Sequence, residues 1–208
     1  MGRSLGPRCK LCRREKMKLF LKGTRCESPK CAIEKGRPPP GEHGRGRVRE
    51  SEYLLQLREK QKAKRFYGIL EKQFRSYYEE AARSKGVTGT ELIRICESRL
   101  DNVVHRSGLA INRAMARQFV SHGHMEVNGK KVNIPSFRVK PGDVVSVRNR
   151  SKSMGRLVEN TAYAEGRPIP EWLRPNLREM SVEVTALPER EQMDVPVQEQ
   201  LIVEYYSK

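Results

Sequence analysis

The sequence contains no long apolar run. No stretch of its 208 residues approaches the roughly 20 consecutive apolar residues that cross a bilayer. The N-terminus, MGRSLGPRCK, lacks the apolar core of a signal peptide. No long helical pattern pairs a basic face with a broad Trp, Phe and Leu face, as membrane-surface helices do. These absences predict a cytoplasmic protein with no membrane partner.

The motifs of common enzyme folds are also missing. Neither a P-loop nor a G-x-G-x-x-G motif follows any predicted strand, and no nucleophile stands beside a base in a turn. The sequence therefore predicts a protein that is not an enzyme, with no catalytic residue and no small-molecule substrate.

Acidic residues are scarce in most of the chain. The sequence has 42 Lys and Arg against 25 Asp and Glu, a formal net charge of +17. Residues 1–150 hold 35 basic against 15 acidic residues (+20), whereas residues 151–208 hold 7 against 10 (−3). Nucleic acid is the predicted partner of such a cationic surface. A fragment that ends near Arg150 is expected to keep most of the salt-dependent attraction to RNA.

Cysteine is sparse and concentrated near the start. Four of the five cysteines form the pattern Cys9-x2-Cys12 and Cys26-x4-Cys31. Two close pairs separated by a loop can converge on one Zn²⁺ ion, and this segment has too few apolar residues to fold without such a clip. An iron–sulfur cluster, a reactive dithiol and disulfides are alternatives, although a reducing cytosol disfavours disulfides.

Residues 1–50 are predicted to form this basic metal-binding segment and a linker. The linker reads RPPPGEHGRGRVR, and its Pro and Gly content disfavours regular structure. We interpret it as an ordered linker laid on RNA through Arg45, Arg47 and Arg49. A flexible tether is the alternative, and His43 is an alternative metal ligand.

Residues 51–96 are predicted to form a helical domain. Helices are expected from a Ser51 cap to Gly68, from about Glu71 to Lys85, and from a Thr88-x-x-Glu91 capping box onward. Aromatic residues at helical spacing, such as Tyr67 and Phe74, are more often core residues than stacking platforms for bases. Cys96 lies on the apolar side of the third helix, so we expect a small buried side chain there and not a ligand.

Residues 97–150 change their apolar period half-way. Apolar residues first recur at helical spacing, which predicts a helix pair. An Asn128-Gly129 turn then predicts a hairpin whose apolar residues are Met125, Val127, Val132 and Ile134. Residues 144–147 predict a third strand. The predicted fold class is therefore α+β: a zinc-bound N-terminal segment, a helical domain, and a helix pair with an antiparallel hairpin.

Basic residues dominate the predicted surface of this third segment. Arg113 and Arg117 are four residues apart and share a helical face beside an expected Asn112 cap. We expect them at the centre of an RNA-binding face, and we expect alanine at both positions to cost little stability because exposed helical arginines contribute little. A surface network with Asp101 or Glu126 is the alternative. The supporting basic residues are Arg106, His122, His124, Lys130, Lys131, Arg138 and Lys140.

Residues 151–208 are predicted to be an acidic C-terminal region with loops, a short helix and strands. Trp172 is its expected apolar anchor, and SVEVTALP from Ser181 predicts a strand. The chain ends on an apolar cluster at 201–203.

The run ARQFVSHGHMEVNGKKV, with SRLDNVV before it and RVKPGD after it, resembles the alpha-L RNA-binding module. The cysteine pattern, the PPPGEHG turn and the terminal segments follow in the order of the bacterial small-subunit ribosomal protein four family, which the chain resembles over essentially its whole length. The resemblance implies a zinc-binding structural component of the small ribosomal subunit. It implies binding to a ribosomal RNA junction early in assembly, contact with neighbouring ribosomal proteins and with messenger RNA, and an influence on decoding accuracy. It also implies that residues 181–208 fold back towards the helical domain.

Other functions stay open at this point. Alpha-L modules also occur in pseudouridine synthases and tyrosyl-tRNA synthetases, but too few residues remain outside the module for those catalytic folds. A messenger-binding translational repressor and a DNA-binding zinc protein are further alternatives. A-form RNA is recognised mainly through its shape and phosphates, and the charge pattern fits that mode of binding.

Overall fold

The computed structural model describes every residue of the chain except 1, 3–4, 47–48, 165 and 167. It divides into two compact units, one formed by residues 1–92 with 195–208 and the other by residues 93–194. The chain therefore leaves the first unit and returns to it at the end.

The described residues form α-helices, strands and 3-10 helices, with η marking a 3-10 helix. Their order is α1 (Arg8–Glu15), η1 (Gly23–Cys26), η2 (Glu42–Arg45), α2 (Glu52–Tyr67), α3 (Glu71–Arg83), α4 (Thr88–Glu97), α5 (Leu100–Arg106), α6 (Arg113–Ser121), β1 (Met125–Val127), β2 (Lys130–Lys131), β3 (Val144–Val147), η3 (Asn149–Ser151), α7 (Gly155–Ala164), β4 (Leu173–Asn176), β5 (Ser181–Val184), η4 (Arg190–Gln192) and α8 (Glu199–Ser207).

The helices of the first unit begin and end close to the predicted positions. The Ser51 hydroxyl accepts a hydrogen bond from the Leu54 N–H at 3.3 Å, and Gly68 ends α2 with a φ of 68°. Helix α4 begins at Thr88 itself, so Thr88 is not the cap that the sequence predicted. Tyr67 and Phe74 are buried, which confirms them as core residues.

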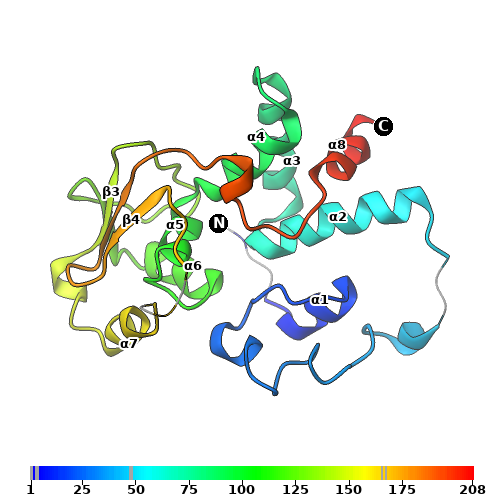
Figure 1. Cartoon of the computed structure of the whole chain (residues 1–208), viewed down its shortest axis with the longest axis horizontal. Helices are drawn as coiled ribbons and strands as arrows, with labels where there is room; N and C mark the ends of the chain where they lie inside the picture. Colours follow the sequence, from blue (N-terminus) through cyan, green and yellow to red (C-terminus); the bar gives the residue numbers. More distant parts are fainter. Residues whose placement is uncertain (1, 3–4, 47–48, 165, 167) are drawn as a thin grey trace. The chain divides into compact units, whose positions relative to one another are not determined.

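The C-terminal segment, for which the sequence predicted only an apolar cluster, is helix α8, and it packs on α2 (Figure 1). Ile202 and Tyr206 are four residues apart, so a helix turns both toward the same partner surface. Ile202 is fully buried, and the Tyr206 hydroxyl donates to Glu71 Oε1 at 2.8 Å. The Lys60 ammonium lies 4.4 Å from the centre of the Tyr205 ring. Residues 195–208 thus return to the helical unit, as the resemblance implied, but residues 181–194 do not: they belong to the second unit, where β5 pairs with β3.

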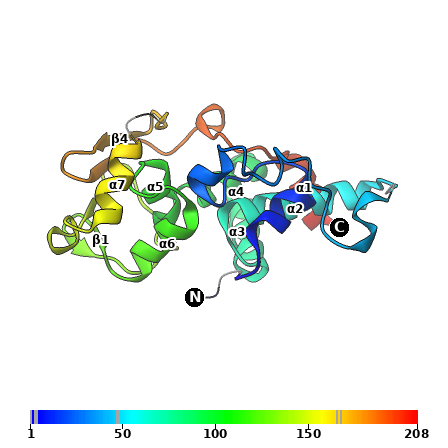
Figure 2. The same ribbon diagram turned by 90° about the horizontal axis from the view of Figure 1, so that it is seen from below.

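The second unit is built on a five-stranded antiparallel sheet in the order β2-β1-β3-β5-β4. Val145, Val182 and Met125 point to one face and share a core with residues of α5, α6 and α7. Helices α5 and α6 lie side by side within this unit (Figure 1 and Figure 2). The predicted helix pair and strands are confirmed, and Trp172, only 2% exposed, is the predicted anchor.

The hairpin forms at the predicted turn, but its second arm is shorter than expected. Asn128 and Gly129 have φ values of 51° and 73°, and Val127 pairs with Lys130. Strand β2 ends at Lys131, and Ile134 is 53% exposed, so the predicted alternation through Ile134 is wrong. The segment after β2 instead supplies carbonyl groups to the first amides of α5: Pro135 accepts from Asp101 and Phe137 from Leu100.

Residues 151–208 are an integral part of the fold. Strand β5 belongs to the sheet of the second unit, where it pairs with β3, and α8 packs on α2. A fragment that ends near Arg150 would lack β4, β5 and Trp172. The expectation that such a fragment keeps the RNA attraction therefore assumes that the fragment folds. The structure speaks against that, because the fragment would lose part of the sheet and of the core.

Candidate nucleic-acid interface and metal centre

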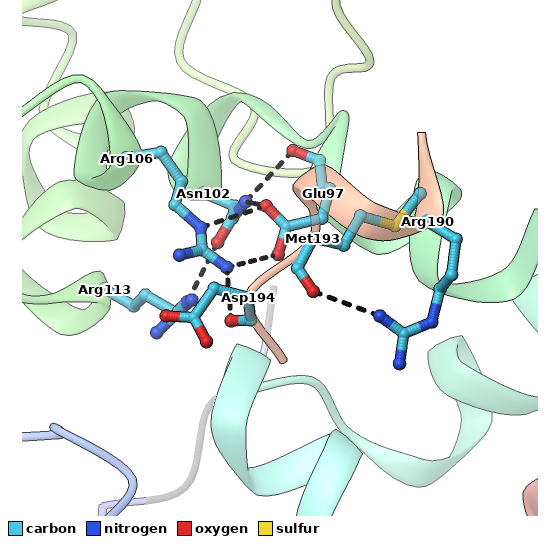
Figure 3. A network of polar contacts seen from close by, with 7 residues as sticks. All are labelled: Glu97, Asn102, Arg106, Arg113, Arg190, Met193 and Asp194. Atoms are coloured by element: carbon cyan, nitrogen blue, oxygen red, sulfur yellow. Dashed lines mark hydrogen bonds and ion pairs between the residues drawn. The ribbon is translucent and has the colours of Figure 1, made fainter. Parts of the chain in front are cut away.

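A buried carboxylate organises the arginines of α5 and α6 (Figure 3). Glu97, 1% exposed, accepts two hydrogen bonds from Arg106, from Nε at 3.1 Å and from Nη2 at 2.9 Å. The Asn102 amide donates to Glu97 Oε2 at 2.6 Å, and its oxygen accepts from Arg113 Nε at 2.9 Å. Arg106 Nη2 also donates to the Asp194 carbonyl at 2.9 Å. The Arg106 guanidinium is therefore hydrogen-bonded both to the Glu97 carboxylate and to the Asp194 carbonyl.

A second buried carboxylate lies one turn of chain away. Asp101 accepts two hydrogen bonds from Arg99, at 3.0 and 2.7 Å, and one from Arg117 at 3.1 Å. Arg113 and Arg117 are only 8% and 9% exposed. The expectation that both arginines are exposed is wrong, because α6 turns their shared face toward α5 and its polar residues. The expected small cost of removing them rested on that exposure. The contact with Asp101 that was the alternative for these arginines exists for Arg117, but it is buried and not a surface pair.

The exposed cations of this unit lie elsewhere. His122, Lys130, Lys131 and Lys140 are exposed, whereas His124 and Arg138 are partly buried. Arg138 contributes a backbone bridge to Arg99. The acidic residue near Lys130 and Lys140 is Asp143. Its carboxylate accepts hydrogen bonds from the Asn128 side-chain amide at 2.8 Å and from the backbone N–H of Lys140 at 2.7 Å.

Two arginines that the sequence did not single out lie beside His124. Arg148 follows β3, and its Nη1 donates to the Gly123 carbonyl at 3.3 Å. Arg150 is exposed in the next turn. Burial lowers the pKa of His124, and the charges of His122, Arg150 and Arg148 lower it further. In the sequence, the only sign that Arg148 and Arg150 belong to a site was their position directly after the predicted strand 144–147.

The structure describes the three arginines of the predicted RNA-binding linker, Arg45, Arg47 and Arg49, to different extents. Arg49 is exposed. Arg47 lies outside the described residues, and for Arg45 the structure describes the backbone alone, in η2. Arg14 Nη2 donates to the Pro40 carbonyl at 2.7 Å, which fastens the proline-rich segment to α1.

The four N-terminal thiols face one small cavity. Cys9, Cys12, Cys26 and Cys31 all line it, and its volume of about 20 Å³ holds about one water-sized sphere. Burial raises the pKa values of Cys12 and Cys26, and the neighbouring cysteines add to the rise. Among the described residues, no three Cys, His, Asp or Glu side chains are already grouped as a metal site.

The chemistry of this donor set still fits a thiophilic cation. A positive ion in the cavity would offset the mutual repulsion of the thiolates. The backbone N–H of Lys22 donates to Cys26 Sγ at 3.4 Å, a contact that favours the thiolate form. Cys96 is fully buried in the other unit, as predicted, and burial raises the pKa of its thiol.

Two family models match adjoining stretches of the chain between residues 3 and 145. Residues 3–97 match the family model described as the ribosomal protein S4/S9 N-terminal domain, and residues 98–145 match the S4 domain. The chain belongs to the ribosomal protein S4 family.

Relatives within the S4 family align over the full chain. The small ribosomal subunit protein uS4 of Acidothermus cellulolyticus is 60% identical over 208 residues, which is the whole of both chains. The proteins of the same name from Acetivibrio thermocellus and Thermodesulfovibrio yellowstonii are 57% and 55% identical, also over the whole of both chains. The match to the S4 domain ends at residue 145, so Arg148 and Arg150 lie just beyond it. In the described part of the chain no helix is long and apolar enough to cross a membrane.

Proposed function

We propose that this protein is a structural component of the small ribosomal subunit that binds ribosomal RNA and neighbouring ribosomal proteins. Its membership of the S4 family over the whole chain carries this proposal. The net charge of +17 and the exposed cations of the second unit supply what phosphate recognition needs. It acts by binding and not as an enzyme, in the cytoplasm where subunits are assembled.

The buried networks have a supporting role in this function. Asn102 and Asp101 of α5 accept hydrogen bonds from Arg113 and Arg117 and so hold α5 against α6. Glu97 of α4 holds Arg106 of α5 in the same way. The neighbouring exposed residues, among them His122 and Lys131, then meet RNA from a rigid framework. A preformed surface loses less conformational entropy on binding.

The experiment that tests this function is co-sedimentation with the small ribosomal subunit. The full-length protein is expected to stay with the subunit through a high-salt wash and to bind small-subunit ribosomal RNA in preference to duplex DNA at the same salt concentration. Protein that remains free, or equal affinity for both nucleic acids, would contradict the proposal. Roles in early assembly and in decoding accuracy are tested by adding the protein to a reconstitution early or late and by measuring misreading.

We also propose that Cys9, Cys12, Cys26 and Cys31 hold one Zn²⁺ ion. Zinc bound by four thiolates is a structural cross-link with no open coordination position. The shared cavity supports this arrangement. Elemental analysis of protein prepared without chelator is expected to give one zinc per chain, and iron or no metal would overturn the assignment.

A further inference from the structure

Five basic side chains gather around one glycine of the second unit. Gly123, with a φ of 73°, follows α6 and precedes β1. A Cβ placed on it would lie 2.6 Å from Lys131 Cε and 3.2 Å from Lys131 Nζ, so the lysine lies directly over the glycine. We call this group the Gly123 cluster; its members are His122, His124, Lys131, Arg148 and Arg150.

The members are brought together by contacts from three segments. The Arg148 guanidinium donates to the Gly123 carbonyl at 3.3 Å, and the Arg148 N–H donates to the His124 carbonyl at 2.9 Å. The His122 and His124 rings are 6.1 Å apart. His124 Nδ1 lies 3.1 Å from the Ser151 hydroxyl in η3, the turn that carries Arg150.

The positive charge of the cluster has no carboxylate counterpart in the described part of the chain. None of Lys131, Arg148 and Arg150 makes an ion pair there, in contrast to Arg106 and Arg117, which are paired with buried acids. Glu126 stands opposite Lys131 across the strand pair, but its Oε1 accepts from the Ser146 hydroxyl at 3.1 Å. The lowered pKa of His124 is a further sign of this local excess of positive charge. Neighbouring cations without an acidic partner repel one another and favour an anion between them.

We propose that the Gly123 cluster binds a phosphodiester of the ribosomal RNA backbone, with Arg148 and Arg150 as its principal donors. The inference rests on the proposed ribosomal function and adds a site to it. Guanidinium groups match phosphate oxygens in a fixed two-pronged geometry. Lys131 adds a third charge over Gly123, where any side chain larger than hydrogen would displace it.

The test measures the affinity of the full-length protein for small-subunit ribosomal RNA over a range of salt concentrations. The variant Arg148→Ala, Arg150→Ala is compared with Arg174→Ala, Arg178→Ala, which removes the same charge from two exposed residues of β4 and the turn after it. Each lost phosphate contact lowers the salt slope of log affinity by about 0.7–0.9, so we expect a loss of about 1.4–1.8 for the first variant. The second variant is expected to keep the wild-type slope. Arg148→Lys, Arg150→Lys keeps the charge and should recover most of the slope.

The outcomes separate the site from the function. If wild-type protein does not bind the RNA, the proposed function itself fails. If wild-type protein binds and both alanine variants have its slope, the cluster faces something other than RNA phosphate and the site is refuted. Equal losses in the two alanine variants would also refute it, because net charge alone would then explain the effect. Melting temperatures verify that each variant is folded.

Discussion

The Asp101 network provides the sharpest test of how the arginines of α6 are used. Asp101 is 4% exposed and lies between the guanidinium groups of Arg99 and Arg117, which are 1% and 9% exposed. Asp101→Ala removes the carboxylate that these two buried cations share, and breaking a buried ion pair costs about 3–5 kcal/mol. Arg117→Ala leaves Asp101 paired with Arg99, so we expect a smaller cost of about 1.5–3 kcal/mol.

The single tryptophan makes the measurement specific to this unit. Trp172 lies in the core that contains α5, α6 and the sheet, so its fluorescence during denaturant unfolding reports on the same cooperative unit. The double variant Asp101→Ala, Arg117→Ala should lose less free energy of unfolding than the two single variants added together. The difference, the coupling energy, should be about 0.5–3 kcal/mol. Arg174→Ala, at an exposed position on β4, is the matched control and should stay within about 0.5 kcal/mol of wild type.

The result that would refute this reasoning is a cost for Asp101→Ala close to that of Arg174→Ala. Such a result would mean that the pair behaves as a solvated surface network, whose contribution is about 0–1 kcal/mol. Arg113 and Arg117 would then be available to RNA, as the sequence alone suggested.

Three further predictions concern pH and metal. Burial raises the pKa of Glu71, but hydrogen bonds from Lys64, Lys60 and Tyr206 outweigh it and hold that pKa at about 2, below the ordinary 4.5. The stabilisation of the folded protein by the ionised Glu71 carboxylate is therefore present above about pH 4.5 and lost as pH falls toward 2. Glu71→Gln should flatten this part of the plot of melting temperature against pH. An unchanged plot would exclude Glu71 as the source of the pH dependence. Cys12→Ser, or removal of metal by a chelator, should make residues 8–35 sensitive to protease while the second unit stays resistant, and Cys96→Ala, which should keep the zinc, is the control. RNA phosphate should raise the lowered pKa of His124, so affinity should rise as pH falls from about 8 to about 5.5, and His124→Gln should lose most of that rise; an equal rise in the variant would assign it to another group.

Local patterns in the sequence determined most of the secondary structure. The Ser51 and Asn112 caps, the Asn128-Gly129 turn and the strand at Ser181 depend on neighbours within a few residues, and they form where predicted. The family was also readable from the sequence, because its motifs are contiguous runs. The terminal helix was not predicted, because its helical form depends on a partner surface on α2 and α3 that is more than a hundred residues away.

The assignment of the charged residues needed the tertiary structure. Composition locates the excess of cations, but it does not say which cations face a carboxylate. Arg117 and Arg148 are both arginines on the same unit; one is paired with buried Asp101, and the other stands in the Gly123 cluster without an acid partner among the described residues. That difference arises because α5 supplies acids to the face of α6, whereas the end of β3 brings only further cations to Gly123. Sequence fixes which charges exist, and packing decides which of them are already neutralised and which are left for RNA.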